Sequence, residues 1–342
     1  MRIVVIGGGF AGISAKAINK EAIVIDEREY FELTPKLVNF IEGEGAETAL
    51  IPRNVDLKEK VRKIDFKERT VETQSKNIKY DKLIIAIGYE QDLSRIKGAE
   101  RYSLKYEGFR DAMKLKDKVK SVNSLIIAGG GPLGIELAGS IVKANSKVKV
   151  KLIEAEDRLL PFLSPETSRY ALKLLEEIGV EVELKTSIEE IVEGGALTSK
   201  GLIKGELVVF AGGFKGNSLI REWDLSSKND RMLVNEYLMS VDYEDVFGAG
   251  DCATFKNGFI PQSAQIASQS GEVAMRNALS KGELIKFRPK TRAIVLRVGD
   301  KYFGELEGKF IKGNTAKLIK NVAIELTKSK IRIASAVPQL VQ

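Results

Sequence analysis

Residues 1–26, MRIVVIGGGFAGISAKAINKEAIVID, decide the fold of this chain. The apolar residues 2–6 predict a β-strand, and the glycine-rich turn GGGFAG follows at once. Residues 13–19 have the pattern of a helix, and residues 22–25 predict a second strand that ends at Asp26. A strand, a glycine turn, a helix and a second strand form the unit that binds a dinucleotide in Rossmann-like domains.

The glycines of this turn have the spacing GxGxxG. Gly7 permits a tight turn, Gly9 lets a pyrophosphate approach backbone N–H groups, and Gly12 lets the helix pack on the strand. The N-terminus of the helix adds partial positive charge for the phosphates. Asp26 follows Gly7 by 19 residues and is placed to accept hydrogen bonds from a ribose. We expect one dinucleotide site at Gly7, Gly9, Phe10, Ala11, Gly12 and Asp26.

The same pattern returns in residues 124–154. An apolar run precedes GGGPLG, a helical pattern follows, and a further strand ends at Glu154. An acid in this place repels a 2′-phosphate and favours NADH over NADPH, although Lys151 and Arg158 lie near it in the sequence. We expect a second dinucleotide site at Gly129, Gly131, Pro132, Leu133, Gly134 and Glu154.

A buried-looking strand follows each turn at nearly the same distance. Residues 82–88 and 206–213 are apolar runs that end in AIG and AGG. The repeat therefore places Gly88 at the first site and Gly212 at the second. Two dinucleotide sites in one chain imply that electrons pass from one nucleotide to the other.

The composition excludes several classes of function. The chain has 342 residues, which favours two domains or more. It has no histidine, so Ser-His-Asp catalysis and histidine-ligated metals are excluded, and we expect no metal site. Its single cysteine, Cys252, excludes a disulfide framework and a dithiol within the chain. An external cofactor is therefore expected to carry the chemistry.

Positive charge gathers at the C-terminal end. Residues 281–342 contain fourteen basic and five acidic residues, a net charge of +9, whereas the whole chain carries +7. Such a segment suggests an anionic membrane surface or a nucleic acid as partner, or else a solvated basic face. No aromatic stacking platform accompanies it, so we expect no nucleic acid. Apolar runs are too short to span a membrane and no signal peptide is evident, which predicts a cytoplasmic protein.

Longer motifs make the chain similar to one group of flavoproteins. They are GGGFAG at 7–12, YFELTP at 30–35, GGGPLGIELAG at 129–139, VFGAGDCA at 246–253 and AQIASQSG at 264–271. With these motifs the chain resembles the type II NADH dehydrogenases, the NADH:quinone oxidoreductases among the flavoproteins with two dinucleotide-binding domains. The resemblance covers about residues 1–280.

This resemblance implies an α/β fold with two Rossmann-like domains in a glutathione-reductase-like arrangement. The FAD-binding domain would comprise residues 1–105 and 235–285, and the NADH-binding domain residues 106–234. Residues 286–342 would form a small basic region that contacts a membrane surface or a second subunit. FAD at the first site would take hydride from NADH at the second and pass the electrons to a quinone.

The resemblance also implies roles for single residues. Gly250 and Asp251 would bind FAD through the VFGAGDCA motif. The helix that opens at AQIASQSG would face the flavin pyrimidine with Ala264 and Gln265. Gln265 and Gln269 are four residues apart, so they share a helix face and would donate to a quinone carbonyl, unless they bridge ordinary packing.

Two charged residues are the catalytic candidates. Glu136 follows Gly134 by two residues, and the matching acid of similar flavoproteins points toward the nicotinamide or the flavin. A carboxylate there would orient the carboxamide or connect the flavin to solvent protons, unless it serves only the helix N-terminus. Lys36 directly follows YFELTP and is a candidate to reach the flavin edge and to pair with Glu136.

The chain departs from similar families in two places. Disulfide reductases carry a cysteine pair near the first helix or in the NADH domain, and sulfide:quinone oxidoreductases need cysteines beside the flavin. Here Cys252 is the only candidate, and its GDCA context suits a small buried filler. The type II enzymes usually carry a longer tail with amphipathic membrane helices, and here only residues 316–328 qualify. Ile324 breaks the pattern of that segment. Its expected apolar face comprises Leu318, Ile319, Val322, Ala323 and Leu326.

The sequence thus predicts an FAD-dependent NADH:quinone oxidoreductase that associates peripherally with the inner face of the cell membrane. A homodimer is left open. One alternative is a soluble NADH-dependent reductase that passes electrons to an iron–sulfur protein or to oxygen. Others are a sulfide:quinone oxidoreductase-like protein that lacks the cysteines, and an FAD-binding redox sensor with negligible turnover.

Overall fold

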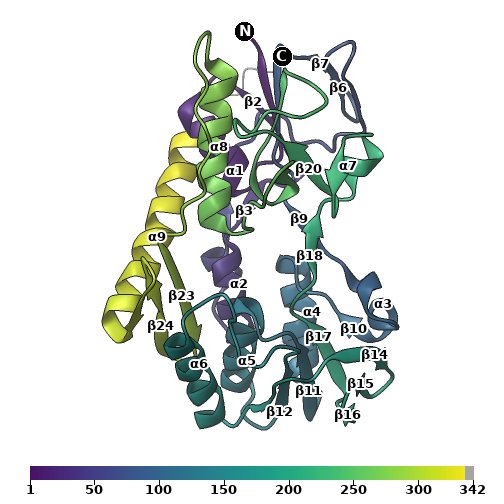
Figure 1. The fold of residues 1–342 in the computed structure, drawn as a ribbon, viewed down its shortest axis with the longest axis vertical. Helices are drawn as coiled ribbons and strands as arrows, with labels where there is room; N and C mark the ends of the chain where they lie inside the picture. Colours follow the sequence, from purple (N-terminus) through teal and green to yellow (C-terminus); the bar gives the residue numbers. More distant parts are fainter. Residues whose placement is uncertain (336–342) are drawn as a thin grey trace.

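The two glycine turns lie in two parallel sheets, one in each lobe of the computed structural model, which describes residues 1–335 (Figure 1). In the first lobe, β1 (Ile3–Ile6) leads into α1 (Phe10–Ile18) and β2 (Ile23–Ile25). The strand order is β2-β1-β8-β21, with β8 at Lys82–Ile85 and β21 at Val246–Gly248. Because β21 pairs with β8, the chain returns to the first lobe after it has built the second, as the VFGAGDCA motif implies.

The second lobe repeats this plan around β11 (Ser124–Ala128), α5 (Pro132–Ala144) and β12 (Lys149–Ile153). Its five strands pair in parallel in the order β10-β17-β11-β12-β13. β1 and the last four residues of β11 are buried, as expected for parallel strands that helices cover on both faces. The predicted α/β class with two Rossmann-like units is confirmed. The other strands of this sheet are β10 (Ser103–Leu104), β13 (Glu181–Glu183) and β17 (Leu207–Phe210).

The remaining elements are helices and strands of smaller, separate sheets. In the first lobe they are β3 (Tyr30–Glu32), β4 (Leu50–Pro52), β5 (Lys63–Asp65), β6 (Thr70–Glu72), β7 (Asn77–Lys79), α7 (Leu219–Glu222), β19 (Ser227–Lys228), β20 (Arg231–Val234), β22 (Ala253–Phe255) and α8 (Ala264–Leu279). In the second they are α3 (Ala99–Tyr102), α4 (Phe109–Val119), α6 (Pro165–Glu177), β14 (Ile188–Val192), β15 (Gly195–Thr198) and β16 (Gly201–Lys204). The helix α2 (Thr34–Ile41) packs on α4 and α5 of the second lobe.

The chain crosses between the lobes on two antiparallel strands, β9 (Tyr89–Gln91) and β18 (Phe214–Gly216). Both crossings come earlier than the predicted boundaries. β10 pairs with β17 in the second sheet, although residues up to 105 were assigned to the FAD-binding domain. β20 pairs with β22 of the first lobe, although residues 106–234 were assigned to the NADH-binding domain. The sheet pairings correct both boundaries, which no local sequence pattern marks.

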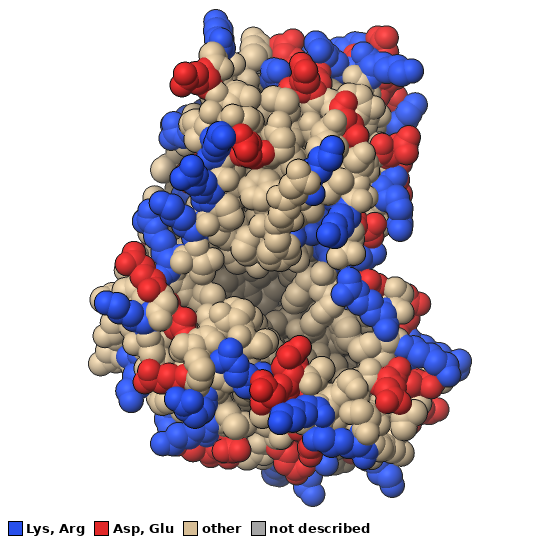
Figure 2. Space-filling model, viewed as in Figure 1, with Lys and Arg blue, Asp and Glu red and all other residues tan. Residues whose placement is uncertain are grey.

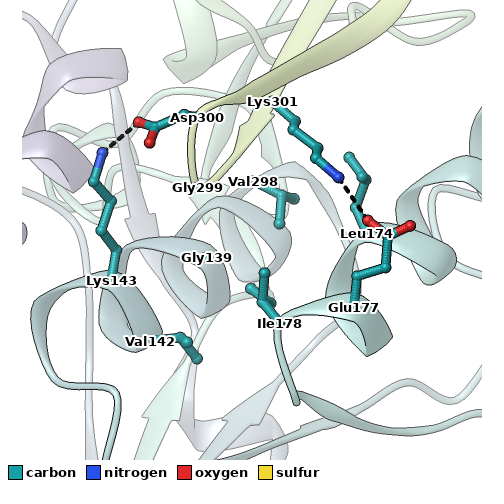
Figure 3. Close-up of a pocket in the computed structure, with 10 residues that line it drawn as sticks. All are labelled: Gly139, Val142, Lys143, Leu174, Glu177, Ile178, Val298, Gly299, Asp300 and Lys301. Atoms are coloured by element: carbon teal, nitrogen blue, oxygen red, sulfur yellow. Dashed lines mark hydrogen bonds and ion pairs between the residues drawn. The ribbon is translucent and has the colours of Figure 1, made fainter.

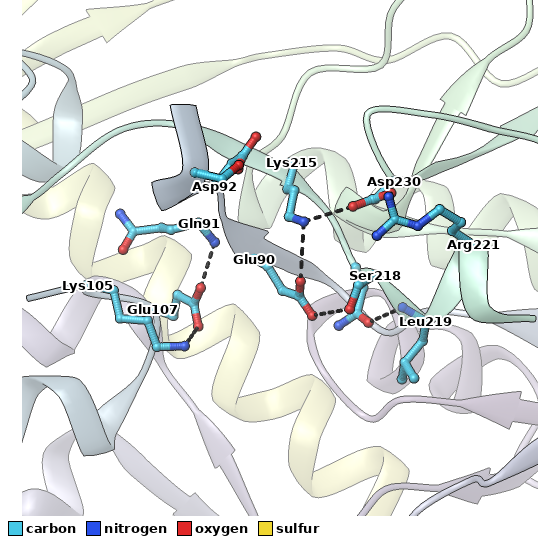
Figure 4. Close-up of polar contacts among 12 residues, drawn as sticks. Glu90, Gln91, Asp92, Lys105, Glu107, Lys215, Ser218, Leu219, Arg221 and Asp230 are labelled. Atoms are coloured by element: carbon cyan, nitrogen blue, oxygen red, sulfur yellow. Dashed lines mark hydrogen bonds and ion pairs between the residues drawn. The ribbon is translucent and has the colours of Figure 1, made fainter. Parts of the chain in front are cut away.

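Polar contacts hold these crossing strands in place (Figure 4). Lys215 on β18 forms ion pairs with Asp230 at 2.8 Å and with Glu90 on β9 at 3.8 Å. The Ser218 hydroxyl donates to Glu90 at 3.1 Å. The seam between the lobes therefore contains paired charges with side chains from both crossing strands.

The C-terminal region adds an antiparallel sheet and a long helix. The strands are β23 (Ala293–Val298), β24 (Lys301–Leu306) and β25 (Lys309–Lys312), and α9 spans Gly313–Ser335. The β23–β24 turn packs on α5 and α6 around a cavity of about 340 Å³ (Figure 3). Lys301 pairs with Glu177 there at 2.7 Å, and Lys143 pairs with Asp300. A Cβ on Gly139 would lie 2.9 Å from the Gly299 nitrogen, so the AG of GGGPLGIELAG permits this approach.

The helix expected over residues 316–328 lies within α9, but it presents a different face to the protein. Ile324, which breaks the amphipathic pattern, is 7% exposed and packs with Ile13, Phe31 and Leu33. The face that carries Leu318, Val322 and Leu326 points away from the core, with exposures of 64%, 50% and 61%. Within residues 1–335, no helix has the length and apolarity needed to cross a bilayer.

Candidate functional site

The first glycine turn is bound to the acid that follows the next strand. The Gly8 N–H donates to Asp26 Oδ2 at 2.7 Å, and the Arg28 N–H donates to Oδ1 at 2.9 Å. A Cβ on Gly12 would collide with the Gly7 carbonyl oxygen, whereas the space beside Gly9 is open. Gly12 therefore permits the close approach of helix and turn, and the open space at Gly9 is compatible with the predicted phosphate contact, which stays a prediction.

The second turn has the same construction. The Gly130 N–H donates to Glu154 Oε2 at 2.7 Å, and the Glu156 N–H donates to Oε1 at 2.9 Å. A Cβ on Gly134 would collide with the Gly129 carbonyl oxygen, and the space beside Gly131 is open. Asp26 and Glu154 are therefore equivalent acids, each positioned against the turn that precedes it.

Lys151 and Arg158, the two cations near Glu154 in the sequence, contact other groups. Lys151 pairs with Glu181 at 3.1 Å. Arg158 donates to the carbonyl oxygens of Pro161 and Leu163, the latter at 3.0 Å. Neither cation pairs with the carboxylate of Glu154 within residues 1–335.

Asp251 follows a tight turn at Gly250, whose φ is +77°, a value that favours glycine. The Gly250 N–H donates to the Ser270 hydroxyl on α8 at 2.8 Å. Asp251 is half-buried as a whole residue, and its Oδ1 is buried with no hydrogen-bond partner within residues 1–335. Burial raises the pKa of Asp251 to about 6. An unpartnered carboxylate oxygen here fits a site that FAD would complete.

Glu136 lies on α5 and is mostly buried. Its Oε1 accepts from the Arg297 N–H of β23 at 3.0 Å and also binds Lys320 Nζ of α9. Both side chains of the Glu136–Lys320 pair are 12% exposed. The predicted partner was wrong: Lys36 pairs with Glu44 at 3.7 Å.

The face in Figure 2 is hollowed between the two lobes, and largely uncharged side chains line the hollow. A family model described as pyridine nucleotide-disulphide oxidoreductase matches residues 1–271. The chain belongs to this family.

Within the pyridine nucleotide-disulphide oxidoreductases, the chain is similar to curated relatives of one kind. A type II NADH:quinone oxidoreductase from Staphylococcus saprophyticus is 28% identical, over 94% of this chain and 93% of that protein. A counterpart from Staphylococcus aureus is 27% identical with the same coverage. The resemblance seen in the motifs is confirmed over most of the chain.

Solved structures share the fold at lower identity. NDH2 from Plasmodium falciparum in complex with NADH has a TM-score of 0.83 at 16% identity, covering 98% of this chain and 97% of that one. The sulfide:quinone oxidoreductase from Aquifex aeolicus has a TM-score of 0.80 at 19% identity, covering 98% and 92%. In both cases the similarity extends over nearly the whole chain, and so it includes the C-terminal sheet and helix.

Although the family name refers to disulphides, the single cysteine of this chain lies in a packed interior. Cys252 is fully buried, and its Sγ lies 3.4 Å from the Ile85 carbonyl oxygen and 3.3 Å from that of Ala249. Burial raises the pKa of the Cys252 thiol to about 11, so the thiolate is scarce at neutral pH. Within residues 1–335, no group of three acidic or cysteine side chains could hold a metal ion.

The two glutamines on α8 face the segment that leads to the C-terminal sheet. Gln269 donates to the Lys290 carbonyl oxygen at 2.8 Å and accepts from its N–H at 3.1 Å. Gln265 accepts from the Arg292 N–H at 2.7 Å through its oxygen. Gln269 therefore bridges ordinary packing, the alternative left open for it. Within residues 1–335, the Gln265 amide nitrogen has no hydrogen-bond partner.

Three cations of this region had no signal in the sequence. Arg53 lies beside the first turn, while Arg297 and Lys320 lie near Glu136. Arg297 also pairs with Glu42 and donates to Asn39 at 3.2 Å. Each contact joins segments that lie far apart in the chain. The sequence alone does not distinguish such paired cations from the surface lysines and arginines of the basic tail.

The raised pKa of Asp251 predicts a pH-dependent cost in the FAD-free protein. Its neutral form is favoured by folding, so this stability is present below pH 3.8 and is lost as the pH rises through about 6. One pKa unit corresponds to about 1.4 kcal/mol, so D251N should raise the free energy of unfolding at pH 7 by about 2–3 kcal/mol. Urea denaturation at pH 4 and pH 7 measures this. An equal gain at both pH values would contradict it, and D251N should also weaken FAD binding.

Proposed function

We propose that this chain is an FAD-dependent NADH:quinone oxidoreductase. The observation that carries the proposal is the duplicated turn, in which Asp26 and Glu154 are held by the backbone N–H groups of Gly8 and Gly130. The curated relatives named type II NADH:quinone oxidoreductases support it along nearly the whole length. FAD would bind at the first turn and NADH at the second.

Bound FAD supplies the chemistry, because a flavin can accept a hydride and release electrons to another acceptor. The chain's own residues would bind the two nucleotides and orient them. The open space beside Gly9 and Gly131 leaves room for phosphates at the N-termini of α1 and α5. Asp26 and Glu154 would hold the riboses, and Asp251 would bind the first cofactor through its unpartnered Oδ1.

Glu136 is the residue that we propose to handle protons. Its carboxylate binds Lys320 Nζ and the Arg297 N–H, and these two contacts fix its orientation. A quinone takes up protons when it is reduced, and the chain contains no histidine for this role. Lys36 is not part of the proposal because its partner is Glu44.

The quinone would use Gln265 rather than both glutamines. The oxygen of Gln265 accepts from the Arg292 N–H, which orients the amide and leaves its nitrogen as a donor. Ser263 caps the first turn of α8 by accepting from the Ile266 N–H at 3.2 Å. The positive end of this helix would favour negative charge on a reduced flavin or quinone.

Steady-state NADH oxidation by the FAD-loaded protein tests the proposal. A water-soluble quinone should be reduced, and E136Q should lower this rate by about 100-fold because general acid–base steps contribute on that order. The rate with ferricyanide, which takes electrons without protons, should change little. Transfer to oxygen or an iron–sulfur protein without quinone reduction would overturn the proposal and favour a soluble reductase.

The choice of nucleotide follows from Glu154. NADH should reduce the bound flavin faster than NADPH by at least about tenfold, since like charges at close range cost several kcal/mol. E154Q should narrow this gap, whereas K151A should leave it, because Lys151 pairs with Glu181. Stopped-flow bleaching of the flavin measures both rates. A preference that E154Q does not change would show that another group excludes the 2′-phosphate.

We further propose that α9 attaches the protein to an anionic membrane surface. The exposed face of Leu318, Val322 and Leu326 lies on a region that carries +9 over residues 281–342. Lys320 and Ile324 hold the opposite face to the core. A helix with an outward apolar stripe and flanking lysines can lie in the plane of an anionic interface.

The triple variant L318S/V322S/L326S should bind vesicles of phosphatidylglycerol and phosphatidylcholine at least about tenfold more weakly, since all three positions lose apolar burial in the bilayer. Co-sedimentation measures binding. L197S/L202S is a matched control, because these leucines of β15 and β16 are 39% and 57% exposed on the second lobe. Binding should also weaken between about 0.1 M and 1 M salt. Equal effects of the two variants would contradict attachment through α9.

A further inference from the structure

The two glycine turns have different side chains behind the second residue of each. A Cβ on Gly8 would collide with Nη1 of Arg53. At the equivalent Gly130 a Cβ would lie 2.5 Å from Cδ2 of Leu159. The first turn is therefore backed by a guanidinium and the second by an apolar side chain.

Arg53 directly follows β4, and its side chain is 1% exposed. Its Nη1 donates to the Gly8 carbonyl oxygen inside the turn, and its Nη2 pairs with Asp26 Oδ2 at 2.9 Å. Nη2 also lies 3.2 Å from the Arg28 carbonyl oxygen. Its Nε is buried and has no hydrogen-bond partner within the described residues. The guanidinium thus belongs to the turn and keeps one donor unused.

The charge of this group affects the acid as well. Burial alone would raise the pKa of Asp26, but Arg53, Arg28 and two backbone N–H groups bring it below its ordinary value. Burial lowers the pKa of Arg53, yet a guanidinium remains protonated at neutral pH. Asp26 therefore stays ionised beside a fixed cation, whereas Glu154 has no ion pair within residues 1–335.

This difference matches the different demands on the two nucleotides. Under the proposed function, FAD must stay bound through many turnovers, while the nicotinamide nucleotide must leave after each one. Both carry a pyrophosphate with two negative charges. A buried cation beside the turn strengthens its attraction for that group more than an exposed cation would, because water screens it less.

We infer that Arg53 is the specificity-determining residue that makes the first turn retain FAD, while Leu159 leaves the second turn weak enough for exchange. The inference rests on the proposed function only in assigning FAD to the first turn. Arg53 acts on the cofactor through its charge beside the turn and through Asp26, which it holds for the ribose.

Titration of the FAD-free full-length protein with FAD, followed by flavin fluorescence, tests the inference. R53M should raise the dissociation constant about 10- to 100-fold, as expected for loss of a charged hydrogen-bond donor. R53K should be intermediate, because lysine keeps the charge without the planar fork. NADH affinity, measured by calorimetry on the same samples, should be unchanged.

K16M is the matched control for losing a buried ion pair in the same lobe. Lys16 pairs with Asp56 at 2.9 Å, with side-chain exposures of 6% and 10%, and does not touch the turn. K16M should lower the melting temperature but leave FAD affinity within about threefold. If R53M weakens FAD binding no more than K16M does, the inference is overturned.

A second comparison covers the case in which R53M does not fold because Asp26 is left unpaired. D26N/R53M removes both charges, and its FAD affinity is compared with that of D26N alone. A further loss in the double variant supports a direct action of Arg53 on FAD, and equal affinities overturn it. Failure of the wild-type protein to take up FAD would overturn the proposed function, whereas normal FAD binding by R53K and D26N/R53M would overturn only this inference.

Discussion

The hydrogen bond between each glycine turn and the acid after the next strand is the constraint on which the structure depends. Gly8 to Asp26 and Gly130 to Glu154 have the same donor, the same type of acceptor and the same distance of 2.7 Å. Each bond fixes the end of one strand against the beginning of a helix. Because a Cβ on Gly12 or Gly134 would strike the carbonyl of the turn, no other residue type permits this approach.

Two buried polar atoms without partners lie where a ligand would complete the fold. Asp251 Oδ1 and Arg53 Nε are both buried and unpaired within the described residues, and both lie by the first turn or the strand β21 that joins its sheet. A protein normally satisfies such groups, because an unpaired one costs about 1–3 kcal/mol. The position of these two atoms agrees with a cofactor that stays bound at the first turn, whereas the unpartnered hydroxyls of Tyr80 and Tyr106 belong to the packed cores of the two lobes.

Much of this fold could be predicted from local pattern. The two turns, the acids at Asp26 and Glu154 and the return of the chain at Val246 each leave a signal within a few residues. The crossings at β9 and β18 leave none, because short strands that pair across the chain have no hydrophobic period of their own. Lys320 and Arg53 act through contacts between distant segments, so their roles were invisible until the fold was known.

The orientation of α9 shows how one residue can reverse a conclusion drawn from periodicity. Ile324 breaks the apolar stripe of the sequence, yet it anchors the helix to Ile13, Phe31 and Leu33. Lys320 is four residues earlier, so the same anchored face carries it to Glu136. The larger stripe of Leu318, Val322 and Leu326 must then face outward. A rotation that buried this stripe would remove Ile324 from the core and break the Glu136 ion pair. The helix therefore packs through the face that carries Ile324 and Lys320, although the opposite face has more apolar residues.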